Sequence, residues 1–183
     1  MKKSTFWTPL YLGANEDPFR PHFGYVFFYE RNIWATDTHM AYRINSSSYG
    51  LVQEQINILE GKCLSVKQMK RVCRKPSFFI TPEGILHPDT NSLYTYYSID
   101  EVCSSLKKIV PEMIKEIMFT TYEQQDTPEI GVNPTLLENM KRCFGCTILN
   151  LNIQAANKAI ICKPSNGASL DAIGIVMPAM IWD

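Results

Sequence analysis

Six cysteines and three histidines are the residues of this chain whose side chains could act as nucleophiles, bases or metal ligands. One pair, Cys143 and Cys146, has the CxxC spacing of zinc sites and redox centres. No histidine is close to this pair in the sequence, so the alternative is that both are small apolar residues at a helix end. The histidines, His22, His39 and His87, are dispersed along the chain.

The sequence carries no pattern of an active site. It has no nucleophile–base pair, glycine-rich phosphate loop or paired-carboxylate motif. Asp37, in the polar stretch 36–39, is more typical of a turn or a helix cap than of catalysis. We therefore expect no enzymatic activity, no catalytic residue, no metal and no cofactor.

A stripe of basic residues is the stronger candidate for a binding site. Ser65 is a suitable N-cap and Pro76 closes the segment, so the residues between them are predicted to form a helix. The cations that share one face of this helix are Lys67, Lys70, Arg71 and Arg74. Residues 67–75 include no acid, whereas a solvated helix usually mixes signs. The stripe therefore indicates either a helix that faces a polyanion or a basic surface helix without a ligand.

A second short helix is predicted after Asn133, which is a suitable N-cap before Pro134 at the first helical position. Gly145 ends this helix, and Lys141 and Arg142 lie near its C-terminus. These two cations either complement the helix dipole or extend a basic surface.

The composition excludes few classes of function. Lysine plus arginine equals aspartate plus glutamate at 18 each, so only a local basic patch could favour nucleic acid. The apolar fraction of 45% suits a globular core. No apolar run approaches the ~20 residues of a membrane span, and prolines and acids interrupt any leader. We expect a cytoplasmic protein with reduced cysteines and no membrane contact.

Strand patterns account for much of the remaining chain. Residues 24–29 are apolar on both faces, which indicates a strand covered on both sides or lying at an interface. A polar turn at 30–32 and a strand from Ile33 make a hairpin that ends in the polar stretch 36–39. Further strands are predicted at residues 8–12, 63–66, 78–80, 84–86, 92–98, 147–153, 158–162 and 172–177.

Two segments have ambiguous patterns. Residues 52–60 fit either a strand or a helix. Residues 99–117 have a helical pattern with a capping box from Ser98 and Glu101, but Pro111 breaks or kinks a helix. Residues 123–128 are predicted to be a polar linker.

One order of elements recurs along the chain. A strand, a short helix and further strands are predicted at residues 63–98 and again at 129–177, whereas the first 50 residues supply strands without a clear helix. The sequence therefore predicts an α+β fold of two and a half related units, in which short helices pack on larger antiparallel sheets.

Four stretches, taken in order, resemble motifs of the bacterial β sliding clamp of replicative DNA polymerase. Residues 35–41 (ATDTHMA) correspond to its A-T-D-G-H-R-L, and residues 175–180 (IVMPAM) to its V-M-P-M-type last strand. Residues 130–133 (IGVN) are similar to the I-G-F-N pattern before its last core helix. Residues 103–111 take the place of its F-P-D-Y-R-R-V-x-P-like connector. The resemblance runs from about residue 16 to the end and implies a DNA-clamp-like fold.

The resemblance implies two parts. Residues 1–111 resemble the middle domain of a clamp, and residues 112–183 resemble the second half of the last domain. The first clamp domain, the helix of the first repeat and the first half of the last domain have no counterpart here. Residues 99–111 would then form an extended connector rather than a helix, followed by a short helix at 112–118.

In this family, short helices line a ring and contact DNA phosphates without reading the sequence. The resemblance implies that the residues facing duplex DNA are Lys67, Lys70, Arg71, Arg74, Lys141 and Arg142. A net-neutral protein can bind DNA in this way if its charge is segregated.

The resemblance also implies a groove for short peptides of DNA polymerase and other partners, suited to Leu or Phe anchors. Its walls map onto Thr36, Thr38, His39, Ala41, Ser104, Lys108, Ile109, Ile175, Met177, Pro178 and Ala179. Four positions depart from the family pattern, so we expect an altered peptide preference. Thr38 replaces Gly, Met40 replaces Arg, Ala41 replaces Leu and Ala179 replaces Met.

Two functions are compatible with these expectations. The first is a sliding-clamp-like processivity or replication accessory protein, whose partners are duplex DNA, clamp-binding peptides and further copies of the chain. The alternative is a clamp-derived adaptor that binds peptides without forming a ring around DNA. A zinc or thiol protein that uses Cys143 and Cys146 is a third hypothesis.

Overall fold

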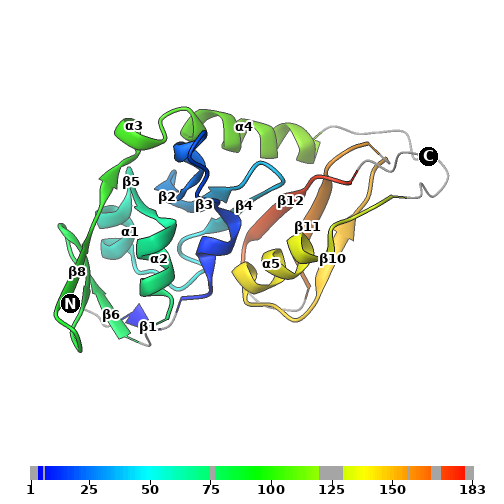
Figure 1. The fold of residues 1–183 in the computed structure, drawn as a ribbon. Helices are drawn as coiled ribbons and strands as arrows, with labels where there is room; N and C mark the ends of the chain where they lie inside the picture. The colour runs from blue at the N-terminus through cyan, green and yellow to red at the C-terminus, as the bar shows by residue number, and fades with distance from the viewer. Residues whose placement is uncertain are drawn as a thin grey trace.

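The structure, a computed structural model, describes residues 4–5, 7–74, 77–119, 130–155, 157–165 and 170–179. Within these ranges it is an α+β fold in which a few helices accompany two antiparallel sheets (Figure 1). The predicted α+β class is confirmed.

The larger sheet has eight strands in the order β10-β11-β12-β4-β3-β2-β5-β9, and all neighbours are antiparallel. Its strands are β2 (Tyr25–Tyr29), β3 (Asn32–Thr36), β4 (Met40–Asn45), β5 (Lys62–Ser65), β9 (Tyr97–Ser98), β10 (Leu149–Asn152), β11 (Ile160–Pro164) and β12 (Ala172–Val176).

Two tight turns connect β2, β3 and β4 at the centre of this sheet. Glu30 and Arg31 form the first turn with φ of 50° and 60°, in the left-handed region that suits two-residue hairpin loops. In the second turn, the Asp37 carboxylate accepts hydrogen bonds from the backbone N–H groups of His39 at 2.9 Å and Met40 at 2.8 Å. Asp37 is therefore a turn residue, as its position in the sequence predicts.

The smaller sheet has the order β1-β6-β7-β8. Its strands are β1 (Ser4–Thr5), β6 (Ser77–Ile80), β7 (Gly84–His87) and β8 (Ser92–Thr95). The strands expected at 78–80 and 84–86 are confirmed and pair as a hairpin, but the single strand expected at 92–98 is wrong. The chain leaves the smaller sheet after Thr95, and from Tyr97 it pairs with Cys63 of β5 in the larger sheet.

Four short helices, two α and two 3-10, lie before residue 73 in the described part of the chain. The ambiguous segment 52–60 is helix α1 (Gln53–Leu59), and the predicted basic helix is α2 (Val66–Val72). The strand expected at 8–12 is wrong, because this segment forms the 3-10 helix η1 (Leu10–Gly13). Leu10 is fully buried and its carbonyl accepts a hydrogen bond from the Tyr42 hydroxyl at 2.7 Å, which holds the turn in the core. A second 3-10 helix, η2 (Pro21–Phe23), precedes β2.

Helix α4 (Leu106–Phe119) replaces the connector that the clamp resemblance implies. The expected extended connector through Pro111 and the expected short helix at 112–118 are therefore wrong. Leu106, Val110 and Ile114 recur every four residues and are 1–3% exposed. Burial of this apolar stripe offsets the cost of Pro111 inside the helix.

A short helix, α3 (Ile99–Val102), precedes α4. The capping box expected from Ser98 and Glu101 is absent at this helix, because no side-chain hydrogen bond caps its N-terminus. The last helix, α5 (Pro134–Phe144), begins and ends where the sequence predicts.

The eight-stranded sheet is covered on both faces (Figure 1). We call these faces the α2/α5 face, where α1, α2, α5 and η1 pack, and the α4 face, where α3 and α4 pack. Side chains alternate between them as the strand period requires: in β2, Val26 and Phe28 join the α2/α5 cluster, and Phe27 joins the α4 cluster. The prediction that this strand is covered on both sides is confirmed.

The predicted recurrence of elements is present. One unit is β5–α2–β6–β7–β8, and the other is an isolated bridge at Gly131 followed by α5–β10–β11–β12. The boundary expected between residues 111 and 112 lies inside α4, and β12 pairs with β4 from Ala172–Ile44 to Val176–Met40. The expected linker at 123–128 and the expected helix terminator Pro76 lie outside the described residues. Within the described ranges, no helix has the length and apolar character to cross a membrane.

Candidate functional site

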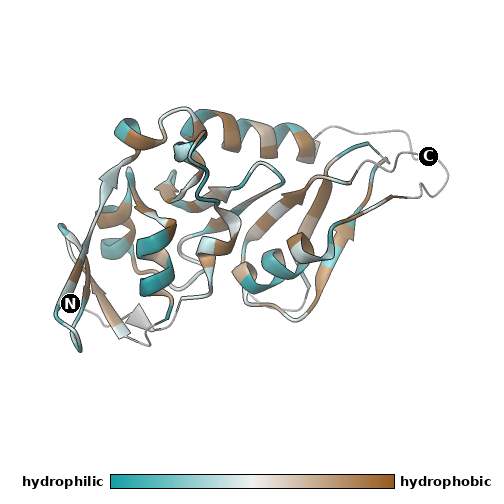
Figure 2. Ribbon diagram, in the orientation of Figure 1, coloured by the Kyte–Doolittle hydropathy of each residue, from teal (hydrophilic) through white to brown (hydrophobic). Residues whose placement is uncertain are grey.

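Helix α2 holds three of the predicted cations at the surface. Its N-cap Ser65 accepts a hydrogen bond from the backbone N–H of Gln68 at 3.3 Å, and the Gln68 side chain accepts one from the backbone N–H of Ser65 at 2.9 Å. Met69 and Val72 are buried, so the opposite side of the helix is exposed to solvent. Figure 2 shows this exposed side of α2 as hydrophilic. The exposed cations are Lys67, Lys70 and Arg71.

Arg74 is exposed but lies beyond the helix, because α2 ends at Val72 and Cys73 is its C-cap. The expected four-residue stripe is therefore three helical residues and one residue in the following turn. Lys67 forms an ion pair with Glu16 at 3.3 Å, and the Lys70 ammonium lies 6.0 Å from the centre of the Tyr11 ring. Glu16 neutralises one member of the stripe.

Helix α5 supplies the other two predicted cations. Asn133 accepts a hydrogen bond from the backbone N–H of Thr135 at 3.0 Å, and Gly145 ends the helix with a left-handed φ of 63°. Lys141 pairs with Glu138 at 2.5 Å, whereas Arg142 is exposed.

A hollow of about 580 Å³ lies between α2 and α5. Lys67 and Lys70 line it from α2, Asn139 lines it from α5, and Tyr11 contributes from η1. Arg142 follows Asn139 by three residues and shares its helix face, whereas Lys141 does not. Lys67 and Lys70 therefore line this concave surface, and the helical period puts Arg142 on the side of α5 that carries Asn139.

Two acids, Glu16 and Asp37, line the hollow, and Glu138 lies elsewhere on α5. Sequence inspection missed the ion pairs of Glu16 and Glu138. Glu138 precedes Lys141 by three residues, so their ion pair was visible in the sequence. Glu16 is far from Lys67 in the sequence and becomes its neighbour only through the fold. In the described part of the chain, Lys70, Arg71, Arg74 and Arg142 have no ion pair within 4.0 Å. These four are the cations left to bind an anion.

Two segments of the expected peptide groove lie side by side. Ala41 of β4 is paired with Ile175 of β12, and the backbone N–H of Met177 donates to the His39 carbonyl at 2.8 Å. Ala179 forms a bridge with Gly131. The exposed members of this group are Thr38, His39, Met177 and Ala179, and Pro178 is half-buried.

Helix α4 buries two members of the expected groove and carries two others on its exposed side. Thr36, Ala41 and Ile175 are buried, and the last two belong to the cluster that α4 completes. Lys108 and Ile109 are exposed on α4, and Ser104 is exposed in the turn before it. Since Val110 and Ile114 occupy the space over the sheet, the expected open groove is reduced to a rim around Met177 and His39.

Thr38 has a strained backbone. Its φ is 80°, a value that a β-branched residue rarely adopts and that glycine adopts freely. Its N–H donates to the Thr36 hydroxyl at 3.3 Å, and that hydroxyl donates to the Met40 carbonyl at 2.9 Å. These bonds hold the turn although its residue type is unfavourable.

Five of the six cysteines are buried, and Cys146 is half-buried. All six are free, and the Cys143 thiol is fully buried and donates to the Pro9 carbonyl at 3.5 Å, away from the half-buried Cys146. Burial raises the pKa of Cys143 far above its usual range and that of Cys73 to about 12, so neither favours a thiolate ligand. Among the residues that the structure describes, no three potential metal ligands gather.

Comparison of the chain with models of protein families, with curated proteins and with solved structures gives no match in any of the three. The function is therefore inferred from the residues and from the geometry described above.

Proposed function

We propose that this protein is a sliding-clamp-like accessory protein that binds duplex DNA through its α2/α5 face without reading the base sequence. Lys70, Arg71 and Arg74 on one side of the hollow and Arg142 on the other contact phosphates. Lys67 and Lys141 contribute less because acids already pair with them.

The observation that carries this proposal is the placement of two short, capped, basic helices on one face of a continuous antiparallel sheet. The sheet fixes the helices on both sides of a hollow, so their cations act together on one polyanion. The left-handed φ of Thr38 supports the clamp resemblance independently, because the similar motif has glycine at that place.

A salt titration of DNA binding tests the proposal. If about four cations replace counterions on the phosphates, the log–log slope of affinity against salt is about −3.6. The affinity then falls roughly 150-fold between about 50 and 200 mM salt. Fluorescence anisotropy with short labelled duplexes of two unrelated sequences should give equal affinities and this slope. Failure to bind at the lower salt concentration, or a slope near zero, would exclude the proposal.

Several copies of this 183-residue chain would be needed to encircle DNA. Strand β10 supplies an edge of the larger sheet on which they can pair, since it is hydrogen-bonded to β11 and is the terminal strand of the sheet order. Ile148, Leu151 and Ile153 at this edge are 42–53% exposed. Light scattering that shows a larger assembly, lost on Leu151→Lys, would support a ring.

The second candidate is an adaptor that binds partner peptides without encircling DNA. It is favoured by the zero net charge and by the acids that pair with Lys67 and Lys141. Its peptide site is the rim formed by His39, Met177 and Ala179. Solution mass separates the candidates. An adaptor has the mass of a monomer with and without duplex DNA, whereas a ring has the mass of several copies, or of several copies with one duplex.

A further inference from the structure

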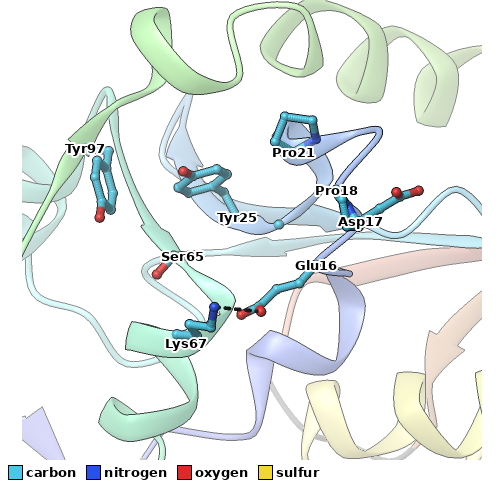
Figure 3. A pocket seen from close by; sticks show the side chains of 9 residues that line it. Glu16, Asp17, Pro18, Pro21, Tyr25, Ser65, Lys67 and Tyr97 are labelled. Atoms are coloured by element: carbon cyan, nitrogen blue, oxygen red, sulfur yellow. Dashed lines mark ion pairs between the residues drawn. The ribbon is translucent and has the colours of Figure 1, made fainter.

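A second hollow, of about 430 Å³, shares Glu16 and Lys67 with the hollow between α2 and α5 (Figure 3). Its lining combines aromatic rings, prolines and carboxylates. The residues that supply these groups are Tyr25, Tyr97, Pro18, Pro21, Glu16 and Asp17.

Two tyrosines from different strands line this hollow. The rings of Tyr25 on β2 and Tyr97 on β9 meet edge to face, with centroids 5.6 Å apart and an interplanar angle of 79°. Tyr97 is 40% exposed, so part of its ring is available to a ligand. Because β2 and β9 both pair with β5, the larger sheet holds the two rings in place. The face of a tyrosine ring attracts cations, and arginine is the cationic side chain found most often over such rings.

The acidic part of the lining already holds a cation. Glu16 binds the Lys67 ammonium at 3.3 Å, although the Lys67 side chain is 79% exposed, so this pair is weak and exchangeable. Asp17 accepts a hydrogen bond from the backbone N–H of Phe19 at 2.8 Å, which shapes the loop beside the hollow. Phe19 is 93% exposed and gives a partner protein an apolar contact next to the acids.

We propose that this hollow binds the arginine side chain of a segment of a partner protein. The guanidinium stacks on the tyrosines and pairs with Glu16, from which it displaces Lys67. Lysine fits less well, since its compact ammonium lacks the planar fork that stacks and pairs at once. A nucleic-acid strand is disfavoured, because two carboxylates and one lysine line the hollow. The proposal does not depend on duplex binding at the α2/α5 face.

Amide chemical shifts of the isotope-labelled full chain test this proposal. The probe is a blocked Pro-Arg-Pro tripeptide, and the control is the same peptide with citrulline, which keeps the shape and removes the charge. The arginine peptide should shift amides of residues 16–25 and Tyr97, and the citrulline peptide should bind about tenfold more weakly. Equal binding of the two peptides, or stronger shifts of these amides by oligothymidylate, would overturn the proposal.

Two pairs of variants locate the contacts. Glu16→Gln should weaken binding of the arginine peptide severalfold, while Asp89→Asn, a change at an exposed acid between β7 and β8, should not. Lys67→Ala removes the internal competitor and should tighten binding severalfold, while Lys70→Ala on the same helix face should leave it unchanged. An unchanged or weaker affinity in Lys67→Ala would contradict the exchange at Glu16. Retention of the wild-type spectrum outside the hollow verifies folding of each variant.

Discussion

The two faces of the eight-stranded sheet are covered in different ways, although the same strands supply both. On the α2/α5 face, α1, α2, α5 and η1 stand over the strands and leave a hollow between α2 and α5. On the α4 face, one helix of 14 residues lies over Trp34, Ala41 and Ile175 and buries its apolar stripe against them. The first face can take a ligand as it stands, whereas the second exposes its sheet only if α4 moves.

This difference allows DNA binding and peptide binding, which the clamp resemblance implies together, to be considered separately. The expected DNA contacts need only exposed cations, and the α2/α5 face presents them. The expected peptide groove needs accessible apolar walls, and α4 buries Ala41 and Ile175. DNA binding and peptide binding can therefore be tested separately, each on its own face.

The largest effect is expected from loosening α4. Ile114 is 2% exposed under the helix, so Ile114→Ala leaves a cavity and should lower the free energy of unfolding by about 2–4 kcal/mol. Ile109 on the same helix is 56% exposed, and Ile109→Ala should change stability by less than about 0.5 kcal/mol. Denaturant unfolding of the two variants checks this pair. Equal small losses would mean that α4 is not packed on the sheet.

Charge reversal on the α2/α5 face should give the next largest effect, and the same change on the α4 face should give almost none. Arg71→Glu with Arg74→Glu should weaken duplex binding roughly 100-fold at low salt and reduce the salt slope by about two. The matched control is Lys108→Glu with Lys115→Glu, two exposed lysines of α4 that should leave duplex binding nearly unchanged. Anisotropy titrations at several salt concentrations measure both. Equal losses from the two pairs would remove the distinction between the faces.

Two helices of the α2/α5 face, α2 and α5, could be predicted because their signals are local. Ser65 with Gln68, and Asn133 with Pro134, lie within a few residues of the backbone groups that they cap or begin. The hairpin turn at Asp37 is local in the same sense. Sequence alone therefore located the elements that carry the cations.

The α4 face was predicted less well because its signals conflict. The periodicity of residues 99–117 indicates a helix, whereas Pro111 and the clamp resemblance indicate an extended connector. The helix forms because burying Val110 and Ile114 on the sheet stabilises it, and this partner surface is assembled from strands distant in the sequence. The split of residues 92–98 between two sheets and the Glu16–Lys67 pair depend likewise on contacts that no local pattern encodes.

A smaller effect, a gain in stability, is expected at the turn between β3 and β4. Thr38→Gly removes the strain of a φ of 80°, and part of this gain is lost to the entropy of glycine in the unfolded chain. The free energy of unfolding should rise by roughly 0.5–1 kcal/mol. The matched control is Thr90→Gly in the turn after β7, where φ is not positive and glycine should not stabilise. Thermal unfolding of both variants measures the difference, and destabilisation by Thr38→Gly would mean that its side chain is needed in the turn.

The smallest effect should come from releasing single cations of the α2/α5 face. Glu16→Gln breaks the ion pair with Lys67, which lines the hollow, and should tighten duplex binding roughly two- to fivefold at low salt. Glu138→Gln releases Lys141 in the same way, but Lys141 is off the helix face of Asn139, so the gain should be smaller. Both changes alter the net charge equally, and general electrostatic attraction would therefore raise the two affinities alike. If Glu16→Gln raises the duplex affinity more than Glu138→Gln does, and makes the salt slope steeper by about one, the DNA phosphates lie beside α2. Equal gains would mean that the duplex responds only to the change in net charge.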